Sequence, residues 1–69
     1  MNLKKRIVEL RPDAVEWARA NGLEPDEIAD DVEIVNGRFI RYRERVVGPD
    51  GAQTFGAPRL VPLKVPPAF

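Results

Sequence analysis

The sequence contains no histidine, no cysteine and no serine, and its side-chain hydroxyl groups are confined to Tyr42 and Thr54. Nucleophilic catalysis needs a serine, cysteine or threonine beside a base, and the usual base near neutral pH is the imidazole that this chain lacks. The glycine-rich motifs that hold phosphate groups are missing as well. These absences exclude most catalytic machinery, so we expect a protein that is not an enzyme and has neither catalytic residues nor a cofactor.

Without histidine and cysteine, a metal site would have to be built from carboxylates, which suit magnesium or calcium far better than zinc. Six acidic residues and no basic residue lie between Glu24 and Glu33. No glycine interrupts this acidic run, so it does not match the calcium-binding loop of EF hands. We expect the run to be a solvated surface without a metal, and a site for a cation or for a basic partner is the alternative.

The length of 69 residues is enough for one small domain, and the lack of cysteine means that apolar packing must stabilise it without disulfides. The basic residues near the N-terminus, Lys4 to Arg6, are not followed by an apolar stretch long enough for a signal peptide or a membrane span. We therefore expect a single cytoplasmic domain, residues 1–69, that does not enter a membrane.

Basic and acidic residues balance at eleven each, which removes the simplest electrostatic argument for a nucleic-acid-binding protein. The charges are unevenly distributed along the chain. The acidic run is followed by a segment in which Glu44 is the single acid among four arginines, at positions 38, 41, 43 and 45. This pattern predicts a molecule with an acidic side and a basic side.

A helix is predicted over residues 12–21, because Pro12 suits the first helical turn and Gly22 suits the position just past the end. Trp17 lies on the apolar face of this helix between alanines, so we expect it to be buried against a sheet. Residues 1–11 form a lead-in that is either extended or a single helical turn, since a residue before proline is pushed away from helical angles.

From Asp31 onward apolar residues tend to occur at every second position, the period of a β-strand, which predicts a β-meander over residues 31–65. Asn36-Gly37 marks the first turn. A three-residue loop over 35–37, with Gly37 in the left-handed conformation, is favoured over a two-residue loop because it collects the apolar side chains on one face. Its register pairs Ile34 with Arg38 and Val32 with Ile40, and the apolar face then consists of Val32, Ile34, Ile40, Tyr42 and Val46.

The second turn is predicted at Gly48-Pro49-Asp50-Gly51, and a short strand over 52–55 should follow it. Pro62 lacks the N–H group that an interior strand needs, so the last strand belongs at a sheet edge. Residues 66–69 read as a proline-rich tail, with Phe69 packed back on the domain. The fold class is therefore α+β, with one N-terminal helix packed on a small antiparallel β-meander of three to four strands.

The opposite face of the first hairpin carries the candidate site for a partner. Its members form an arginine stripe beside one aromatic ring: Phe39, Arg41, Arg43 and Arg45. Such a stripe can meet carboxylates of a protein partner or phosphates of a nucleic acid, or it can be a solvated face that discourages aggregation. A protein partner is favoured over nucleic acid, because few aromatic side chains are present to stack on bases.

The segment Glu16-Trp17-Ala18-Arg19-Ala20-Asn21-Gly22 resembles the helix end in the DNA-binding domain of the H-NS-like nucleoid silencers of actinobacteria. In that family an Arg-Gly-Arg segment follows and enters the minor groove of DNA. Here Glu24-Pro25-Asp26-Glu27 stands in its place, with the opposite charge, so DNA binding is not carried over. Over residues 11–37 and 61–67 the chain is similar to short uncharacterised proteins of actinobacteria and their phages. This resemblance transfers no known activity to the chain.

These observations favour a small accessory or regulatory protein, encoded by a phage or a mobile element, that binds a protein partner through its hairpin or an edge strand. One alternative is a structural component of a larger assembly, such as a virion part or a homo-oligomer joined at the Pro62 strand. The other alternative is a nucleic-acid binder that uses the arginine stripe. The oligomeric state and the identity of the partner are left open by the sequence.

Overall fold

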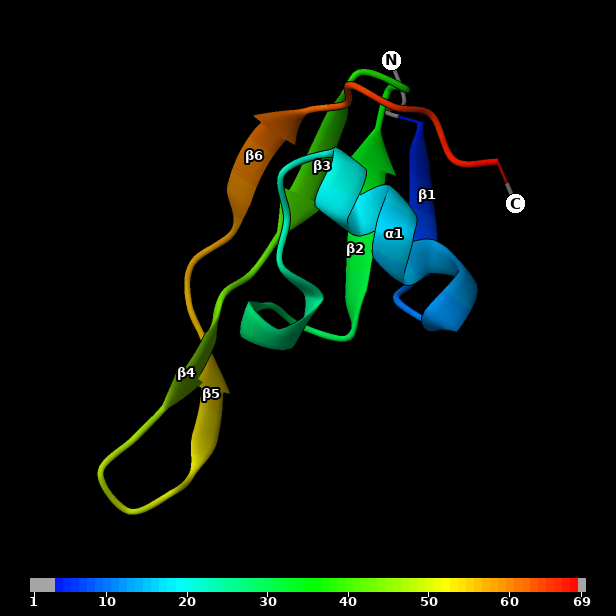
Figure 1. Ribbon diagram of the computed structural model, residues 1–69. Coiled ribbons are helices and arrows are strands. Elements are labelled where there is room, and N and C mark those ends of the chain that lie inside the picture. The colour runs from blue at the N-terminus through cyan, green and yellow to red at the C-terminus, as the bar shows by residue number, and fades with distance from the viewer. Residues whose placement is uncertain (1–3, 69) are drawn as a thin grey trace.

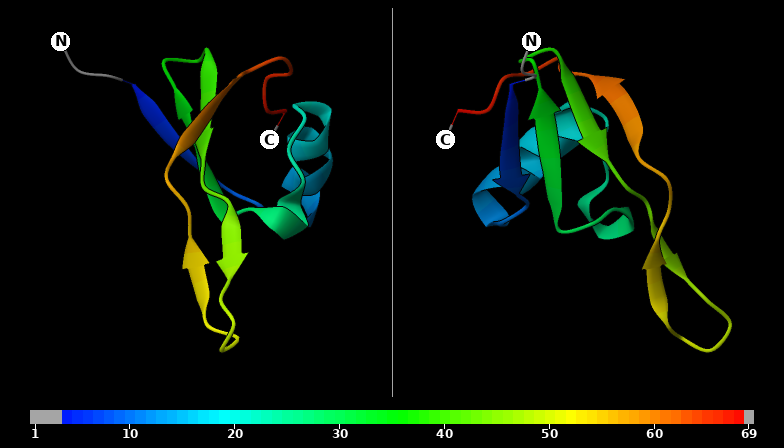
Figure 2. Two further views of the ribbon diagram at one scale, coloured as in Figure 1. Left: turned by 90° about the vertical axis from the view of Figure 1, so that its left-hand side faces the viewer. Right: turned by 180° about the vertical axis from the view of Figure 1, so that it is seen from behind.

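Alternating apolar residues build an antiparallel sheet of four strands in the order β1-β2-β3-β6, and the computed structural model describes residues 4–68 of the chain (Figure 1). The strands are β1 (Lys5–Glu9), β2 (Asp31–Val35), β3 (Phe39–Tyr42) and β6 (Arg59–Pro62). One α-helix, α1 (Pro12–Ala20), crosses one side of this sheet (Figure 2). Within the described residues, the predicted α+β class with a helix on an antiparallel sheet is confirmed.

Helix α1 (Pro12–Ala20) agrees with the predicted helix to within one residue at its end. Gly22 follows with a φ of 84°, the left-handed angle that ends a helix and that glycine adopts without strain. A short 3-10 turn, η1 (Pro25–Glu27), then leads the chain toward β2. Trp17 is buried, as its position on the apolar face of α1 predicted.

The hydrophobic core lies between α1 and the face of the sheet that α1 covers. Antiparallel partners place their side chains on the same face, so the apolar side chains of even number in β1, β2 and β3 point into this core together. Its buried apolar members are Val8, Ala14, Trp17, Ala18, Leu23, Ile28, Val32, Ile34 and Ile40. A core of this size gives the domain a small free energy of unfolding, so the loss of any one member is expected to lower stability noticeably.

Residues 5–9 of the lead-in are extended and form β1, which pairs antiparallel with β2. Of the two alternatives for this segment, the helical turn is therefore wrong. Val8 points into the core, whereas Ile7 lies 67% exposed on the other face of the sheet. A strand of five residues with a single buried side chain shows too little apolar alternation to be recognised from sequence.

The predicted register of the first hairpin is wrong by two residues. The structure pairs Ile34 with Ile40 and Val35 with Phe39, so the loop is 36–38 instead of 35–37. Asn36 and Gly37 have φ angles of 54° and 64°, both left-handed, and the turn is closed by a 3.0 Å hydrogen bond from the Arg38 N–H to the Val35 carbonyl. A shift of two residues keeps the side chains of β2 and β3 on their predicted faces, so the core assignments of Val32, Ile34 and Ile40 survive.

The prediction that the apolar face of the first hairpin continues from Ile40 through Tyr42 to Val46 is wrong. Strand β3 ends at Tyr42, and β4 (Arg45–Val47) pairs with β5 (Gln53–Phe55) in a separate two-stranded sheet that projects from the domain as an arm (Figure 1). The chain leaves the main sheet where the Ala29 N–H donates to the Arg43 carbonyl at 3.0 Å. Val46 is consequently 45% exposed on the arm instead of buried.

The turn of the arm and the edge position of β6 agree with the predictions. The Gly51 N–H donates to the Gly48 carbonyl at 3.0 Å, which closes the predicted turn. Strand β6 pairs with β3 alone, so Pro62 lies in an edge strand. Beyond β6, the Val65 carbonyl accepts a 2.6 Å hydrogen bond from Nε1 of Trp17, which anchors the start of the tail, whereas Phe69 lies outside the described residues.

Candidate interaction face of the sheet

One side of the four-stranded sheet carries α1 and η1, and its other side, which we call the open face, is covered by neither (Figure 2). The pairing of the strands determines which side chains point there, because partners across antiparallel strands share a face. The open face is formed by Lys5, Ile7, Glu9, Asp31, Glu33, Val35, Phe39, Arg41, Leu60 and Pro62.

Large apolar side chains are exposed on both flanks of the open face. Ile7 in β1 is 67% exposed, and Leu60 in β6 is 60% exposed. Phe39, at the start of β3, is 43% exposed. Protein interfaces likewise combine exposed apolar side chains with polar groups.

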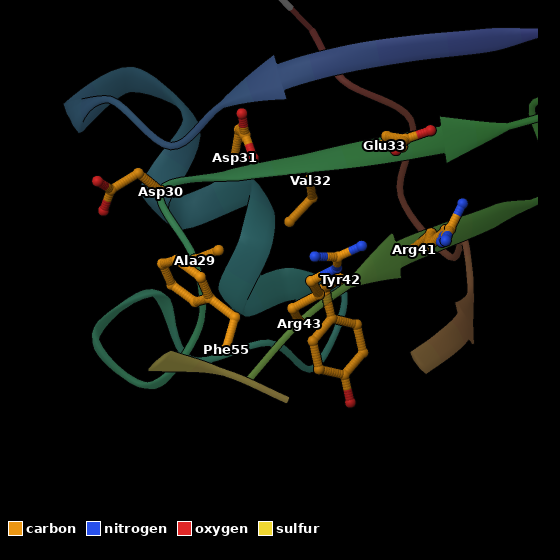
Figure 3. Close-up of a pocket in the computed structure, with 9 residues that line it drawn as sticks. All are labelled: Ala29, Asp30, Asp31, Val32, Glu33, Arg41, Tyr42, Arg43 and Phe55. Carbon is orange, nitrogen blue, oxygen red and sulfur yellow. The ribbon is translucent and has the colours of Figure 1, made fainter. Parts of the chain in front are cut away.

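A hollow of about 420 Å³ opens on this side near the base of the arm (Figure 3). Strand β2 contributes Asp31 and Glu33 to its lining, and Arg41 comes from β3. Arg43, just past the end of β3, and Phe55, from the arm, complete the charged and aromatic part of the lining. The hollow therefore offers cationic, anionic and aromatic groups within a small area.

The hollow contains two cationic side chains, Arg41 and Arg43. Among the described residues neither of them forms an ion pair or a side-chain hydrogen bond. Arg59, by contrast, pairs with Glu44 at 2.7 Å on the same end of the sheet. The two guanidinium groups of the hollow thus retain their hydrogen-bonding capacity for a ligand.

Arg45 lies apart from the rest of the predicted stripe. It begins β4, and its side chain is only 27% exposed. Its guanidinium group donates to the Ile28 carbonyl at 3.1 and 3.3 Å and to Oδ1 of Asp30 at 2.7 Å. The prediction of three arginines along one strand is therefore wrong, because the strand breaks after Tyr42 and Arg45 ties the base of the arm to the segment before β2.

The predicted separation into an acidic side and a basic side is also wrong. The hairpin places Glu33 directly opposite Arg41, and the arm base brings Arg45 onto Asp30. Arg19 approaches Glu24 at 3.6 Å from the end of α1. Acidic and basic side chains are thus neighbours, because β2 carries Asp31 and Glu33 and the strand paired with it carries Arg41.

The sequence patterns did not indicate three residues that lie on the open face or border its hollow: Ile7, Leu60 and Phe55. Ile7 belongs to the lead-in, whose extended form was only one of two alternatives, and its face depends on pairing with β2. Leu60 lies on the open face because it pairs with Arg41 across β3 and β6. Phe55 is exposed on β5 because the arm leaves the main sheet. The signal available for Ile7 was its place beside Val8, a β-branched pair typical of strands.

Carboxylates do not gather into a metal site: in residues 4–68, no three acidic side chains come close enough to hold an ion together. The same part of the chain has no helix with the length and apolar character needed to cross a membrane. Comparisons of the chain with protein-family models, with curated proteins and with solved structures found no match.

Proposed function

We propose that this protein is a non-enzymatic accessory or regulatory protein that binds a protein partner on the open face of its sheet. The observation that carries the proposal is that the open face combines exposed apolar side chains with two guanidinium groups that form no ion pair within residues 4–68. Phe39 and Leu60 supply apolar area, and arginine is among the residues enriched in protein interfaces. Arg41 and Arg43 supply hydrogen-bond donors for carboxylates of the partner.

A protein partner is favoured over nucleic acid by the charges of the neighbouring strand. Asp31 and Glu33 lie on β2, and paired strands are about 4.8 Å apart. A phosphate that approached Arg41 would therefore also approach these carboxylates, which repel it at short range. A folded partner can place a basic or polar group near the acids and an acidic group near the arginines, which a uniform phosphate backbone cannot do.

Site-specific photo-crosslinking tests this proposal. A photoreactive phenylalanine analogue placed at Phe39 reports on the open face, and the same analogue at Glu16, which is exposed on α1, is the matched control. We expect one protein to crosslink at position 39 and not at position 16. The crosslinked protein is then purified, and its affinity for the parent chain is measured by titration.

The outcome against the proposal is equal crosslinking at the two positions, or a purified candidate that binds no better than an unrelated protein. Duplex and single-stranded DNA are titrated in parallel at physiological salt. If the chain binds DNA and this binding requires Arg41 and Arg43, the partner is a nucleic acid and the proposed protein partner is wrong.

A further inference from the structure

Strand β1 has one side of its backbone paired with β2 and the other side unpaired. The Asn36 N–H donates to the Lys4 carbonyl at 2.7 Å, and the Leu10 N–H donates to the Asp30 carbonyl at 2.8 Å. Hydrogen-bonded positions alternate along an antiparallel ladder, so residues of even number in β1 bond to β2. The N–H and C=O groups of Lys5, Ile7 and Glu9 therefore point outward from the sheet.

Of these outward groups, the Glu9 carbonyl accepts a 2.9 Å hydrogen bond from the Arg11 N–H. The remaining carbonyls and N–H groups of the outer edge have no such bond in the part of the chain described. An open hollow of about 360 Å³ runs beside this edge and is lined by residues 6–9 together with Arg11, Asp13 and Ala14. The edge is therefore accessible to another strand.

The opposite edge of the sheet, β6, is blocked by proline. The Leu63 N–H donates to the Arg38 carbonyl at 2.8 Å, so by the same alternation Leu60 and Pro62 direct their backbone nitrogens outward. Pro62 has no N–H group, which leaves Leu60 as the single outward donor of this strand. Strand addition is thus favoured at β1 and disfavoured at β6, where proline is a common protection of edges.

We propose that a second copy of this chain adds to β1, with the two β1 strands antiparallel about a two-fold axis at Ile7. In this register the Ile7 N–H of each copy donates to the Ile7 carbonyl of the other. Lys5 of one copy faces Glu9 of the second copy at both ends of the strand. The Glu9 N–H then donates to the Lys5 carbonyl across the interface, and all these groups are outward groups of the monomer.

Charge complementarity selects both this partner and this register. Lys5 and Glu9 are equally distant from Ile7 and share its face, so an antiparallel second copy brings opposite charges together twice. An axis at Arg6 would place two arginines directly opposite each other, and an axis at Val8 would place Lys5 opposite Arg11, another like-charged pair. With the axis at Ile7, Arg6 lies opposite Val8 of the second copy.

The existing partner of Glu9 leaves room for this contact. Nε of Arg11 donates to Oε2 of Glu9 at 2.7 Å, and Oε1 has no hydrogen bond within residues 4–68. Lys5 of the second copy can therefore reach the free carboxylate oxygen. The proposed dimer joins two four-stranded sheets into one, and it brings the exposed Ile7 side chains together at the two-fold axis on the open face.

Charge reversal with sedimentation analysis tests the interface. The parent chain should populate a dimer at concentrations up to about 1 mM, the weak end of measurable association. Lys5→Glu should weaken the dimer about tenfold or more, because it sets two pairs of like charges face to face, and Glu9→Lys should do the same. The double change Lys5→Glu/Glu9→Lys restores opposite charges and should restore the dimer. Lys64→Glu, an exposed change of equal charge away from β1, should leave it unaltered.

Crosslinking of single cysteines identifies the edge independently of charge. The chain has no cysteine of its own. A short thiol crosslinker should join two copies of Ile7→Cys, whose Cα atoms would lie about 5.5 Å apart, and should not join copies of Leu60→Cys on β6. A chain that stays monomeric at about 1 mM, a double change without recovery, or crosslinking at position 60 in place of position 7 would each overturn the proposal.

Discussion

The side-chain amide of Asn21 and the backbone of Val65 form a two-way hydrogen-bonded pair, like two residues of neighbouring strands. Oδ1 of Asn21 accepts from the Val65 N–H at 2.9 Å, and Nδ2 donates to the Val65 carbonyl at 3.1 Å. Asn21 also accepts from the Lys64 N–H at 2.8 Å and donates to the Trp17 carbonyl at 2.9 Å. A buried asparagine at the end of α1 thus anchors the segment that follows β6.

Asn21→Ala should destabilise the domain by about 2–3 kcal/mol, since the N–H groups of Lys64 and Val65 lose the part-buried oxygen that accepts their hydrogen bonds. Asn21→Asp should be destabilising as well at neutral pH, because a carboxylate oxygen would replace Nδ2 and face two carbonyls. Urea denaturation monitored by Trp17 fluorescence measures both changes. Gln53→Ala, an exposed polar change on the arm, is the control, and an Asn21→Ala variant as stable as this control would contradict the anchoring role.

Trp17→Ala should destabilise the domain by about 3–5 kcal/mol and unfold a large part of the population, because the side chain is buried in a small core. Trp17→Phe keeps most of the apolar volume and loses the hydrogen bond from Nε1 to the Val65 carbonyl. We expect Trp17→Phe to be intermediate between parent and Trp17→Ala in thermal unfolding measured by circular dichroism. A melting temperature of Trp17→Ala within a few degrees of the parent would show that the indole carries little of the core energy.

Gly37→Val should destabilise the hairpin between β2 and β3 far more than Asn36→Asp. Gly37 has a φ of 64°, where a β-branched residue is strained by about 1–2 kcal/mol, although a Cβ atom there would meet no other atom within 4 Å. Asn36→Asp retains a residue that tolerates the left-handed region and keeps the oxygen that accepts from the Lys4 N–H. Chemical denaturation of the two variants compares them, and equal destabilisation would argue against the turn geometry.

The three arginines of the predicted stripe should differ in how much each contributes to the free energy of unfolding. Arg45→Gln should destabilise the domain by about 1–2 kcal/mol, mainly because the half-buried Ile28 carbonyl contact is lost. Arg41→Gln and Arg43→Gln should each change the free energy of unfolding by about 0.5 kcal/mol or less. Urea midpoints at equal ionic strength provide the comparison, and three equal effects would show that Arg45 has no special structural part.

The sequence predicted those parts of the fold that local rules determine. Pro12 and Gly22 bracket α1, Trp17 is buried, and Pro62 lies at an edge, because each depends on the chemistry of one residue and its near neighbours. The faces of β2 and β3 were also predicted, since they follow from an alternation of two. Their register was not, because Asn36 adopts the left-handed conformation in addition to Gly37.

The candidate site was predicted less well, because it depends on contacts between distant segments. Phe39, Arg41 and Arg43 lie on the uncovered side as expected, but the place of Arg45 depends on Ile28 and Asp30, more than a dozen residues earlier. Alternation alone extends β3 to Val46, and it cannot show that the Ala29 N–H takes up the Arg43 carbonyl and turns the chain away.

If the open face binds a protein partner, Arg41→Gln/Arg43→Gln should weaken that binding about tenfold or more per arginine, about 1.4 kcal/mol each, while the fold persists. The physical reason is that both guanidinium groups form no ion pair within the described chain, so their hydrogen bonds can be made to the partner. The affinity of the parent should also fall as salt is raised, since exposed charges are screened within about 10 Å at 0.1 M salt.

The matched control is Arg38→Gln/Lys64→Gln, which removes the same two positive charges from exposed positions outside the hollow. Titration of each variant with the purified partner at two salt concentrations separates a local contact from a general effect of charge. Equal losses in the two double variants would mean that net charge alone governs association. A loss confined to Arg41→Gln/Arg43→Gln would place the contact in the hollow beside Phe55, where the partner must supply an acidic group to match the two arginines.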